Sequence, residues 1–246
     1  MKKTTLVLTA LAALTALPTL SHAEDASPLT FNVGVTSDYR YRGISQSRLK
    51  PAVQGGLDYA LPGGFYIGTW ASSIKWIKDA GGKADAEVDL YGGYKGEIAK
   101  DVAFDVGFLR YQYPRNRLAT SANTNEIYGA VTFGPATVKY SHSVTNLFGF
   151  AKSKNSGYLD VSASFDVGGG VMLAPHLGYQ KVAKNSDFSY MDYSLIVSKD
   201  FNGLVVSGGV VGADTKSIGG VKAYASPKNG KDLGKVGAVV GVKYNF

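Results

Sequence analysis

The chain has 246 residues, a formal net charge of +7 and no cysteine. The lack of cysteine excludes disulfide scaffolds, cysteine-ligated metal sites and cysteine nucleophiles. Glycine is frequent, with 31 residues, and the aromatic side chains are mainly 16 Tyr and 11 Phe. Mean hydropathy is close to zero, at −0.03, so apolar and polar residues balance along the chain.

The first segment has the layout of a secretory signal peptide. Two lysines after Met1 precede an uncharged run from Thr4 to Leu20 and a small-residue site that ends at Ala23. We expect cleavage after Ala23, which removes the two lysines and lowers the formal charge from +7 to +5. No later run reaches the roughly 20 apolar residues of a membrane-spanning helix. Residues 24–246 are therefore expected to form one domain, either a soluble all-β periplasmic protein or an outer-membrane β-barrel.

The sequence after the leader alternates apolar and polar residues in steps of two, as β-strands do. Residues 31–42, for example, place Phe31, Val33 and Val35 on one face and polar residues on the other. Near Phe108 and Leu109 the alternation shifts by one residue, which predicts a β-bulge. The pattern predicts twelve strands, at residues 31–42, 51–61, 64–74, 86–95, 102–113, 125–133, 137–144, 157–166, 171–182, 190–199, 204–213 and 236–246.

The links between these segments alternate in length. Short links rich in turn residues include 61–64, 133–136 and 167–170, whereas polar links such as 75–85 and 214–235 are long. An even number of strands with short turns at one end and long loops at the other is typical of outer-membrane barrels. We therefore predict a closed antiparallel transmembrane β-barrel in which the first and last strands pair and both termini lie at the periplasmic end.

The two faces of the predicted strands support the barrel over a soluble sandwich. Polar positions are often small, such as Gly34, Gly68 and Gly107, where the exposed face of a soluble sheet favours charged residues. These glycines are expected to widen the lumen, to relieve strain where strands curve, or both. Phe31 and Tyr39 lie eight residues apart, roughly 26 Å along a strand, and are expected to mark the two membrane interfaces.

The last predicted strand has one continuous apolar face that ends at the terminal Phe246. It resembles the C-terminal signal of outer-membrane proteins. Tyr244 and Phe246 are therefore predicted to form the assembly signal that the barrel assembly machinery reads.

Charged and aromatic side chains on the inward faces are the candidate site residues. A lipid-facing Arg or Lys near the midplane would cost about 2–4 kcal/mol, so these residues are expected inside. They form either a polar, weakly selective channel for small hydrophilic solutes or a network of neutralising pairs that fills a closed structural or surface-interaction barrel. The predicted pore-lining residues are Asp38, Arg40, Arg42, Asp58, Glu87, Asp89, Tyr91, Asp105, Glu126, Tyr128, Lys139, Asp160, His176 and Asp192.

The excess of basic residues lies mostly in the long loops, where outer-membrane lipid and lipopolysaccharide are the expected partners. No nucleic-acid module occurs, so nucleic acid is not an expected partner. An enzyme is not expected either. Outer-membrane phospholipase A carries a His-x-Ser arrangement, but Val144 is the residue two after His142. His176 has no neighbours at metal-site spacing, and no metal or cofactor is predicted.

The first predicted hairpin carries a family resemblance. Residues 32–47, together with Pro51, the segment Gln54–Tyr59 and Gly68-Thr69-Trp70, resemble the TorF family of porin-like proteins. The resemblance is most specific over residues 31–76. It implies an outer-membrane β-barrel that acts as a solute channel, and it brings no binding residues with it.

Overall fold

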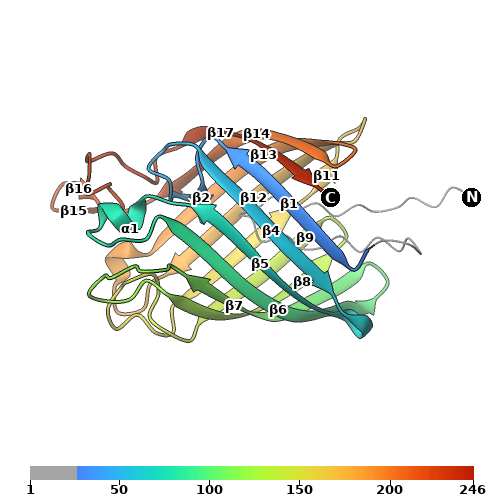
Figure 1. Cartoon of the computed structure of the whole chain (residues 1–246), viewed down its shortest axis with the longest axis horizontal. Coiled ribbons are helices and arrows are strands. Elements are labelled where there is room, and N and C mark those ends of the chain that lie inside the picture. Colours follow the sequence, from blue (N-terminus) through green and yellow to red (C-terminus); the bar gives the residue numbers. More distant parts are fainter. Residues whose placement is uncertain (1–26) are drawn as a thin grey trace, which may run out of the picture.

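The computed structural model describes residues 27–246, which form a closed all-β barrel (Figure 1). The predicted signal peptide and its cleavage site lie outside these residues. Within them, no helix is long and apolar enough to cross a membrane.

Twelve antiparallel strands close the barrel, because β10 and β11 both pair with β12 and form one strand interrupted at Ser164. The fold class predicted from the alternation is confirmed. The barrel strands are β1 Leu29–Thr36, β4 Ala52–Ala60, β5 Phe65–Ser73, β6 Ala86–Ala99, β7 Val102–Gln112, β8 Thr124–Phe133, β9 Ala136–Ser143, β10 Gly157–Ala163 with β11 Phe165–Asp166, β12 Val171–Lys181, β13 Tyr190–Phe201, β14 Leu204–Asp214 and β17 Gly237–Asn245.

The ring closes between β1 and β17, with Asn32 opposite Asn245 and Thr36 opposite Gly241. At the end of this seam, the Phe31 amide donates to the Phe246 carbonyl at 2.8 Å and the Phe246 amide donates back at 3.0 Å. The two rings stack with centroids 5.7 Å apart. Phe246 is therefore part of the closure, through which each of the twelve barrel strands in residues 27–246 is paired on both sides.

The short elements lie at the end of the barrel that carries the long loops, which we call the loop end (Figure 1). They are the hairpin of β2 Arg40–Tyr41 and β3 Ile44–Ser45, the helix α1 Trp76–Asp79, the turn η2 Ser186–Phe188, and the hairpin of β15 Ser217–Ile218 and β16 Val221–Lys222. The opposite end, the turn end, has short links such as η1 Pro62–Gly64, and Phe246 lies there. This alternation agrees with the predicted loop lengths.

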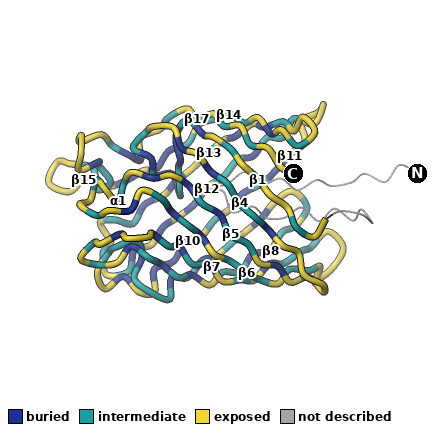
Figure 2. The backbone as a smooth tube through the Cα atoms, in the orientation of Figure 1, coloured by how far each residue is buried: buried dark blue, intermediate teal, exposed yellow. Residues whose placement is uncertain are grey.

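The exposed large residues of the barrel strands are mostly apolar, whereas many buried residues are polar. Exposed and buried positions alternate along the strands (Figure 2). Val33, Val35 and Val240 are each at least 50% exposed on the outside. Glu87, Glu126 and Asp192 are buried on the inside. Lipid-facing barrels divide their residues in this way.

The first predicted strand is wrong beyond Thr36. Ser37 still donates its amide to the Val240 carbonyl at 2.8 Å, but residues 37–50 then turn into the lumen, and we call this segment the lumen hairpin. Arg42 and Gly43 both have positive φ, at 45° and 78°, as a two-residue type I′ hairpin turn requires. Tyr39 is 3% exposed inside the barrel, so its predicted place at a membrane interface is also wrong.

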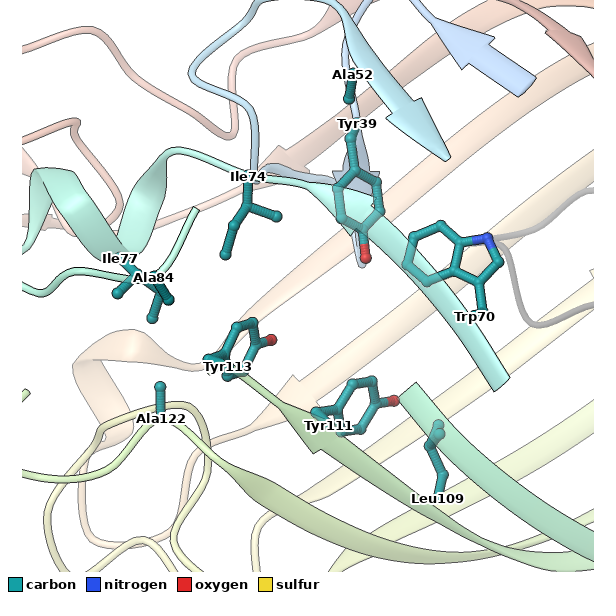
Figure 3. Packing of buried hydrophobic residues seen from close by; sticks show 10 residues of the cluster. All are labelled: Tyr39, Ala52, Trp70, Ile74, Ile77, Ala84, Leu109, Tyr111, Tyr113 and Ala122. Atoms are coloured by element: carbon teal, nitrogen blue, oxygen red, sulfur yellow. The ribbon is translucent and has the colours of Figure 1, made fainter. Parts of the chain in front are cut away.

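The predicted bulge near Phe108 is wrong as well. Strand β7 pairs regularly with both neighbours through Phe108 and Leu109, and the irregularity lies in β6 between Glu97 and Ala99. Leu109 disturbs the apolar pattern because it faces inward, into an apolar cluster at the loop end (Figure 3). The buried members of this cluster are Tyr39, Ala52, Trp70, Ile74, Ile77, Ala84, Leu109, Tyr111, Tyr113 and Ala122.

Candidate functional site

The lumen hairpin is held in shape by its own polar side chains. The Asp38 carboxylate accepts hydrogen bonds from the Ser45 hydroxyl at 2.5 Å and the Ser47 hydroxyl at 3.0 Å. Its second oxygen pairs with Arg40 Nε at 2.5 Å. These groups are buried, so the hairpin enters the lumen as an ordered unit.

Arg42, at the tip of the hairpin, reaches across the lumen to the opposite wall. Its guanidinium donates to both carboxylate oxygens of Glu126 on β8, at 3.1 and 2.7 Å, and to Gln180 Oε1 on β12 at 2.6 Å. The guanidinium carbon also lies 4.1 Å from the centre of the Tyr158 ring. A bidentate pair of this kind fixes geometry as well as charge.

Further hydrogen bonds attach the hairpin to other parts of the barrel. The Tyr39 hydroxyl donates to Glu87 Oε1 on β6 at 2.8 Å, and the hydroxyls of Tyr41 and Tyr111 lie 2.5 Å apart. Arg40 Nη1 donates to the carbonyls of Gly43, Leu233 and Lys235, each at 3.0 Å. The hairpin therefore contacts β6, β7, β8 and β12, as well as the segment before β17.

Buried polar side chains of the barrel wall surround the hairpin. Glu87, Glu126, Gln180 and Asp192 come from β6, β8, β12 and β13, and all four are buried. A second apolar cluster of buried residues consists of Ile44, Tyr190, Ala213 and Leu233. Tyr39 of the hairpin belongs to the first cluster and Ile44 of the hairpin belongs to the second, so the hairpin packs against both.

Loop contacts brace the base of the hairpin. Arg48 Nε donates to Asp79 Oδ2 of α1 at 2.6 Å, and this hydrogen bond raises the pKa of Arg48. In the same loop, the hydrogen bond from Lys78 lowers the pKa of Asp85. Burial raises the pKa of the Tyr224 hydroxyl, which donates to the Phe188 carbonyl at 2.7 Å.

Tyrosine hydroxyls also bind carboxylates on the inner wall of the barrel. Tyr91 donates to Asp58 at 2.5 Å, and Tyr66 donates to Asp105 at 2.6 Å. Tyr158 donates to Asp192 at 3.0 Å, while His176 Nε2 lies 2.7 Å from Asp160 Oδ2. Each of these acids has a partner on another strand, so the wall is cross-linked.

Opposite charges also face each other on two pairs of adjacent strands. Lys95 on β6 is paired in register with Asp105 on β7, and Lys139 on β9 is paired with Asp160 on β10. The Lys139 ammonium lies 4.0 Å from the centre of the Tyr128 ring. This side of the lumen therefore carries both positive and negative charges.

Several inward glycines make room for tyrosine rings. Tyr66, Gly93, Gly107 and Tyr128 are paired in register across β5, β6, β7 and β8. The Tyr66 ring covers Gly93, and the Tyr128 ring covers Gly107. The hydroxyls of the two tyrosines are hydrogen-bonded to each other. Gly68 lies under Tyr91 in the same way. At these positions the glycines do not widen the lumen as expected, because the rings occupy the space.

The opposite wall leaves a cavity of about 150 Å³ beside the hairpin. It is formed by β1, β4, β13, β14 and β17, whose inward residues are mostly small or neutral. The residues that line it include the neutral polar Asn32, Gln54, Ser194 and Ser207 and the charged Asp38, Arg40, Arg42, Asp192 and Lys243. The free space of the lumen therefore lies along this wall.

The fourteen predicted pore-lining residues divide into two groups. Asp38, Arg40 and Arg42 lie on the lumen hairpin instead of the wall. The other eleven lie on barrel strands: Asp58, Glu87, Asp89, Tyr91, Asp105, Glu126, Tyr128, Lys139, Asp160, His176 and Asp192. A pore-lining role stays a prediction for all fourteen. Within residues 27–246, no group of three or more His, Asp or Glu side chains is placed to hold a metal ion.

The sequence pattern does not identify three residues that bind the predicted site residues. Tyr66, Tyr111 and Gln180 hold Asp105, Glu126 and Arg42 respectively. The phase of Tyr66 indicates its inward position, because its neighbours Phe65 and Ile67 are exposed on the outer face. Its partner Asp105 is two strands away, so the alternation alone does not reveal the contact.

His142 and Ser143 face opposite sides of β9. The His142 ring lies 3.3 Å from Asn155 Oδ1, whereas the buried Ser143 hydroxyl donates to the Thr145 carbonyl at 3.0 Å. The two side chains therefore do not form a nucleophile and base pair.

The closed barrel, with its apolar exterior and polar lumen, has the architecture of the porin class. Residues 22–246 match the model of the Gcw_chp family, described as a bacterial protein of unknown function. The chain belongs to this family. No curated protein matches the sequence.

Two solved porins share the fold. The KdgM porin, solved in complex with disordered oligogalacturonate, has a TM-score of 0.55 and 9% identity, covering 89% of this chain and 98% of that porin. The NanC porin has a TM-score of 0.54 and 9% identity, covering 88% and 98%. At this identity the likeness concerns the fold alone.

Proposed function

We propose that the protein is an outer-membrane channel for small hydrophilic solutes, in which the lumen hairpin controls passage. In this proposal the chain is exported to the outer membrane of a Gram-negative bacterium and its leader is cleaved after Ala23. The observation that carries the proposal is a polar lumen with a cavity beside a hairpin, inside a barrel with an apolar exterior. The resemblance of residues 31–76 to the TorF family implies the same function.

The apolar outer face of the barrel supports a membrane environment for the protein. An exposed apolar band around a closed barrel is favourable in hydrocarbon and costly in water. The expected partners are therefore membrane lipid and lipopolysaccharide, and the barrel assembly machinery through Tyr244 and Phe246.

We infer the class of solute from the polar side chains that line the lumen. Its cavity presents amides and hydroxyls, such as those of Asn32, Gln54 and Ser207, which suit hydroxyl-rich solutes. Oligogalacturonate in the KdgM porin is one hydrophilic solute associated with this fold.

A closed structural or surface-interaction barrel is the second candidate. The buried Arg42–Glu126 pair, which spans the lumen, favours it. In the channel proposal, the same pair is the contact that must open before a solute passes. The two candidates therefore differ in whether the hairpin ever leaves its place.

Conductance in planar bilayers separates the two candidates. The channel proposal predicts brief openings for the wild-type protein and a higher open fraction for Arg42→Ala, which loses the contacts to Glu126 and Gln180. Arg110→Ala serves as the control, because Arg110 donates to Gln112 and Asn125 on β7 and β8 and lies outside the hairpin. No conductance above the lipid background from any of the three proteins would support the closed barrel.

A further inference from the structure

We propose that a groove on the outer rim of the barrel binds the phosphorylated headgroup of an outer-leaflet glycolipid such as lipopolysaccharide. The groove lies at the loop ends of β12, β13 and β14, and we call it the rim groove. This inference rests on the proposed outer-membrane location but not on conduction.

The rim groove has a volume of about 460 Å³. Lys181 ends β12, Lys184 lies in the loop that follows, and Lys216 lies just after β14; all three line the groove and are exposed. Lys216 Nζ donates to the Ser186 carbonyl at 3.1 Å, so its side chain crosses between two loops. The lysines therefore converge from three segments of the chain.

The charges in and around the groove favour an anion. Lys222 adds a fourth cation, because its Nζ donates to the Thr215 carbonyl at 2.8 Å. Two acids lie close by. Asp214 lines the groove, and Asp187 Oδ1 is 3.8 Å from Lys216 Nζ. The cations outnumber the acids, and lysines bind phosphate as charge-assisted donors.

The apolar residues below the lysines identify the anion as part of a lipid. Tyr179 and Met191 are paired in register and are each 46% exposed on the outer face. Lys181 follows Tyr179 by two residues, so it lies on the same face about 7 Å nearer the loop end. A glycolipid has acyl chains that would lie against Tyr179 and Met191 and phosphates that would lie at the lysines nearer the loop end. A free phosphate would not contact the two apolar residues.

A buried hydroxyl lines the same groove without a partner. Thr215 is 3% exposed, and its Oγ1 makes no hydrogen bond within the part of the chain that the structure describes. A buried polar atom of this kind needs a partner. A headgroup oxygen in the groove would supply it.

The test measures the binding of hexa-acylated lipid A to the full detergent-purified barrel, by titration followed with native mass spectrometry. The groove variant is Lys181→Gln/Lys184→Gln/Lys216→Gln. The matched control is Lys50→Gln/Lys75→Gln/Lys83→Gln, which loses the same charge on the side of β4 and β5, opposite β12 in the ring. We expect at least about a tenfold weaker Kd for the groove variant, because each lysine near an anionic surface contributes favourably, and no change for the control.

Two further measurements sharpen the assignment. Dephosphorylated lipid A is expected to bind wild-type protein as weakly as intact lipid A binds the groove variant. Thr215→Val, which keeps the shape of the side chain, is expected to weaken binding severalfold while leaving the melting temperature unchanged.

Equal Kd values for the groove variant and the control would overturn the site. Competition by inorganic phosphate at concentrations near that of the lipid would overturn the lipid assignment in favour of a free anion. Conductance is measured separately on the same groove variant. Normal conductance with unchanged lipid binding would reject the groove alone and leave the channel proposal standing.

Discussion

Arg42 and Glu126 form a bidentate ion pair that joins the tip of the lumen hairpin to β8 across the interior of the barrel. The side chain of Arg42 is 4% exposed and that of Glu126 is 2% exposed. Removing one member of such a pair leaves the other charge buried without its partner. The pair therefore ties the position of the hairpin to the stability of the barrel.

Arg42→Met is expected to lower the free energy of unfolding by about 3–5 kcal/mol, because Glu126 then stays buried without a counter-charge. Glu126→Gln leaves the buried Arg42 without a counter-charge and is also expected to destabilise the barrel, although its amide oxygen still accepts a hydrogen bond from Arg42. Urea unfolding in lipid vesicles, followed by tryptophan fluorescence, measures both values. A double variant as unstable as the sum of the single variants would show that the two side chains are not coupled.

Gly107→Ala is expected to destabilise the barrel by about 1–3 kcal/mol, as overpacking does. A Cβ at this position would lie 2.5 Å from the Tyr128 hydroxyl and 2.7 Å from the Gly92 carbonyl. Gly129→Ala is the matched control, because its nearest neighbour would be a Val106 methyl carbon at 3.8 Å. Equal urea midpoints for the two variants would argue against the packing of tyrosine rings over glycines.

Deletion of Phe246 is expected to reduce the amount of assembled barrel at the cell surface. The deletion removes both the predicted assembly signal and the hydrogen bonds between Phe246 and Phe31 that end the seam. Phe133→Ala serves as a control, because Phe133 is an exposed aromatic residue at the turn end that takes no part in the seam. Heat-modifiable migration on gels measures assembly, and wild-type yield after the deletion would contradict the prediction.

Alternation along the chain was sufficient to predict the number of strands, their order and the closure between β1 and β17. These features depend on the period-two pattern and on loop length, which are local properties of a sequence. The same pattern placed residues such as Asp58, Glu126 and Asp192 on inward-facing strand positions.

The lumen hairpin could not be predicted in this way. Residues 37–42 continue the alternation of β1, and their departure into the lumen depends on contacts with distant residues such as Glu87 and Gln180. The inward apolar residue Leu109 led to the wrong prediction of a β-bulge for the same reason. Leu109 has an apolar partner inside the barrel because the hairpin brings Tyr39 there, and a single strand carries no information about this.

The most direct test of the account is liposome swelling with a barrel whose hairpin is shortened. Replacing residues 40–45 by two glycines removes Arg42 and the turn that presses against the lumen wall, while the barrel strands stay intact. We predict faster uptake of small sugars than with wild-type protein and exclusion of larger oligosaccharides. A correctly folded variant with no more uptake than protein-free liposomes would contradict the claim that the hairpin is what closes the lumen.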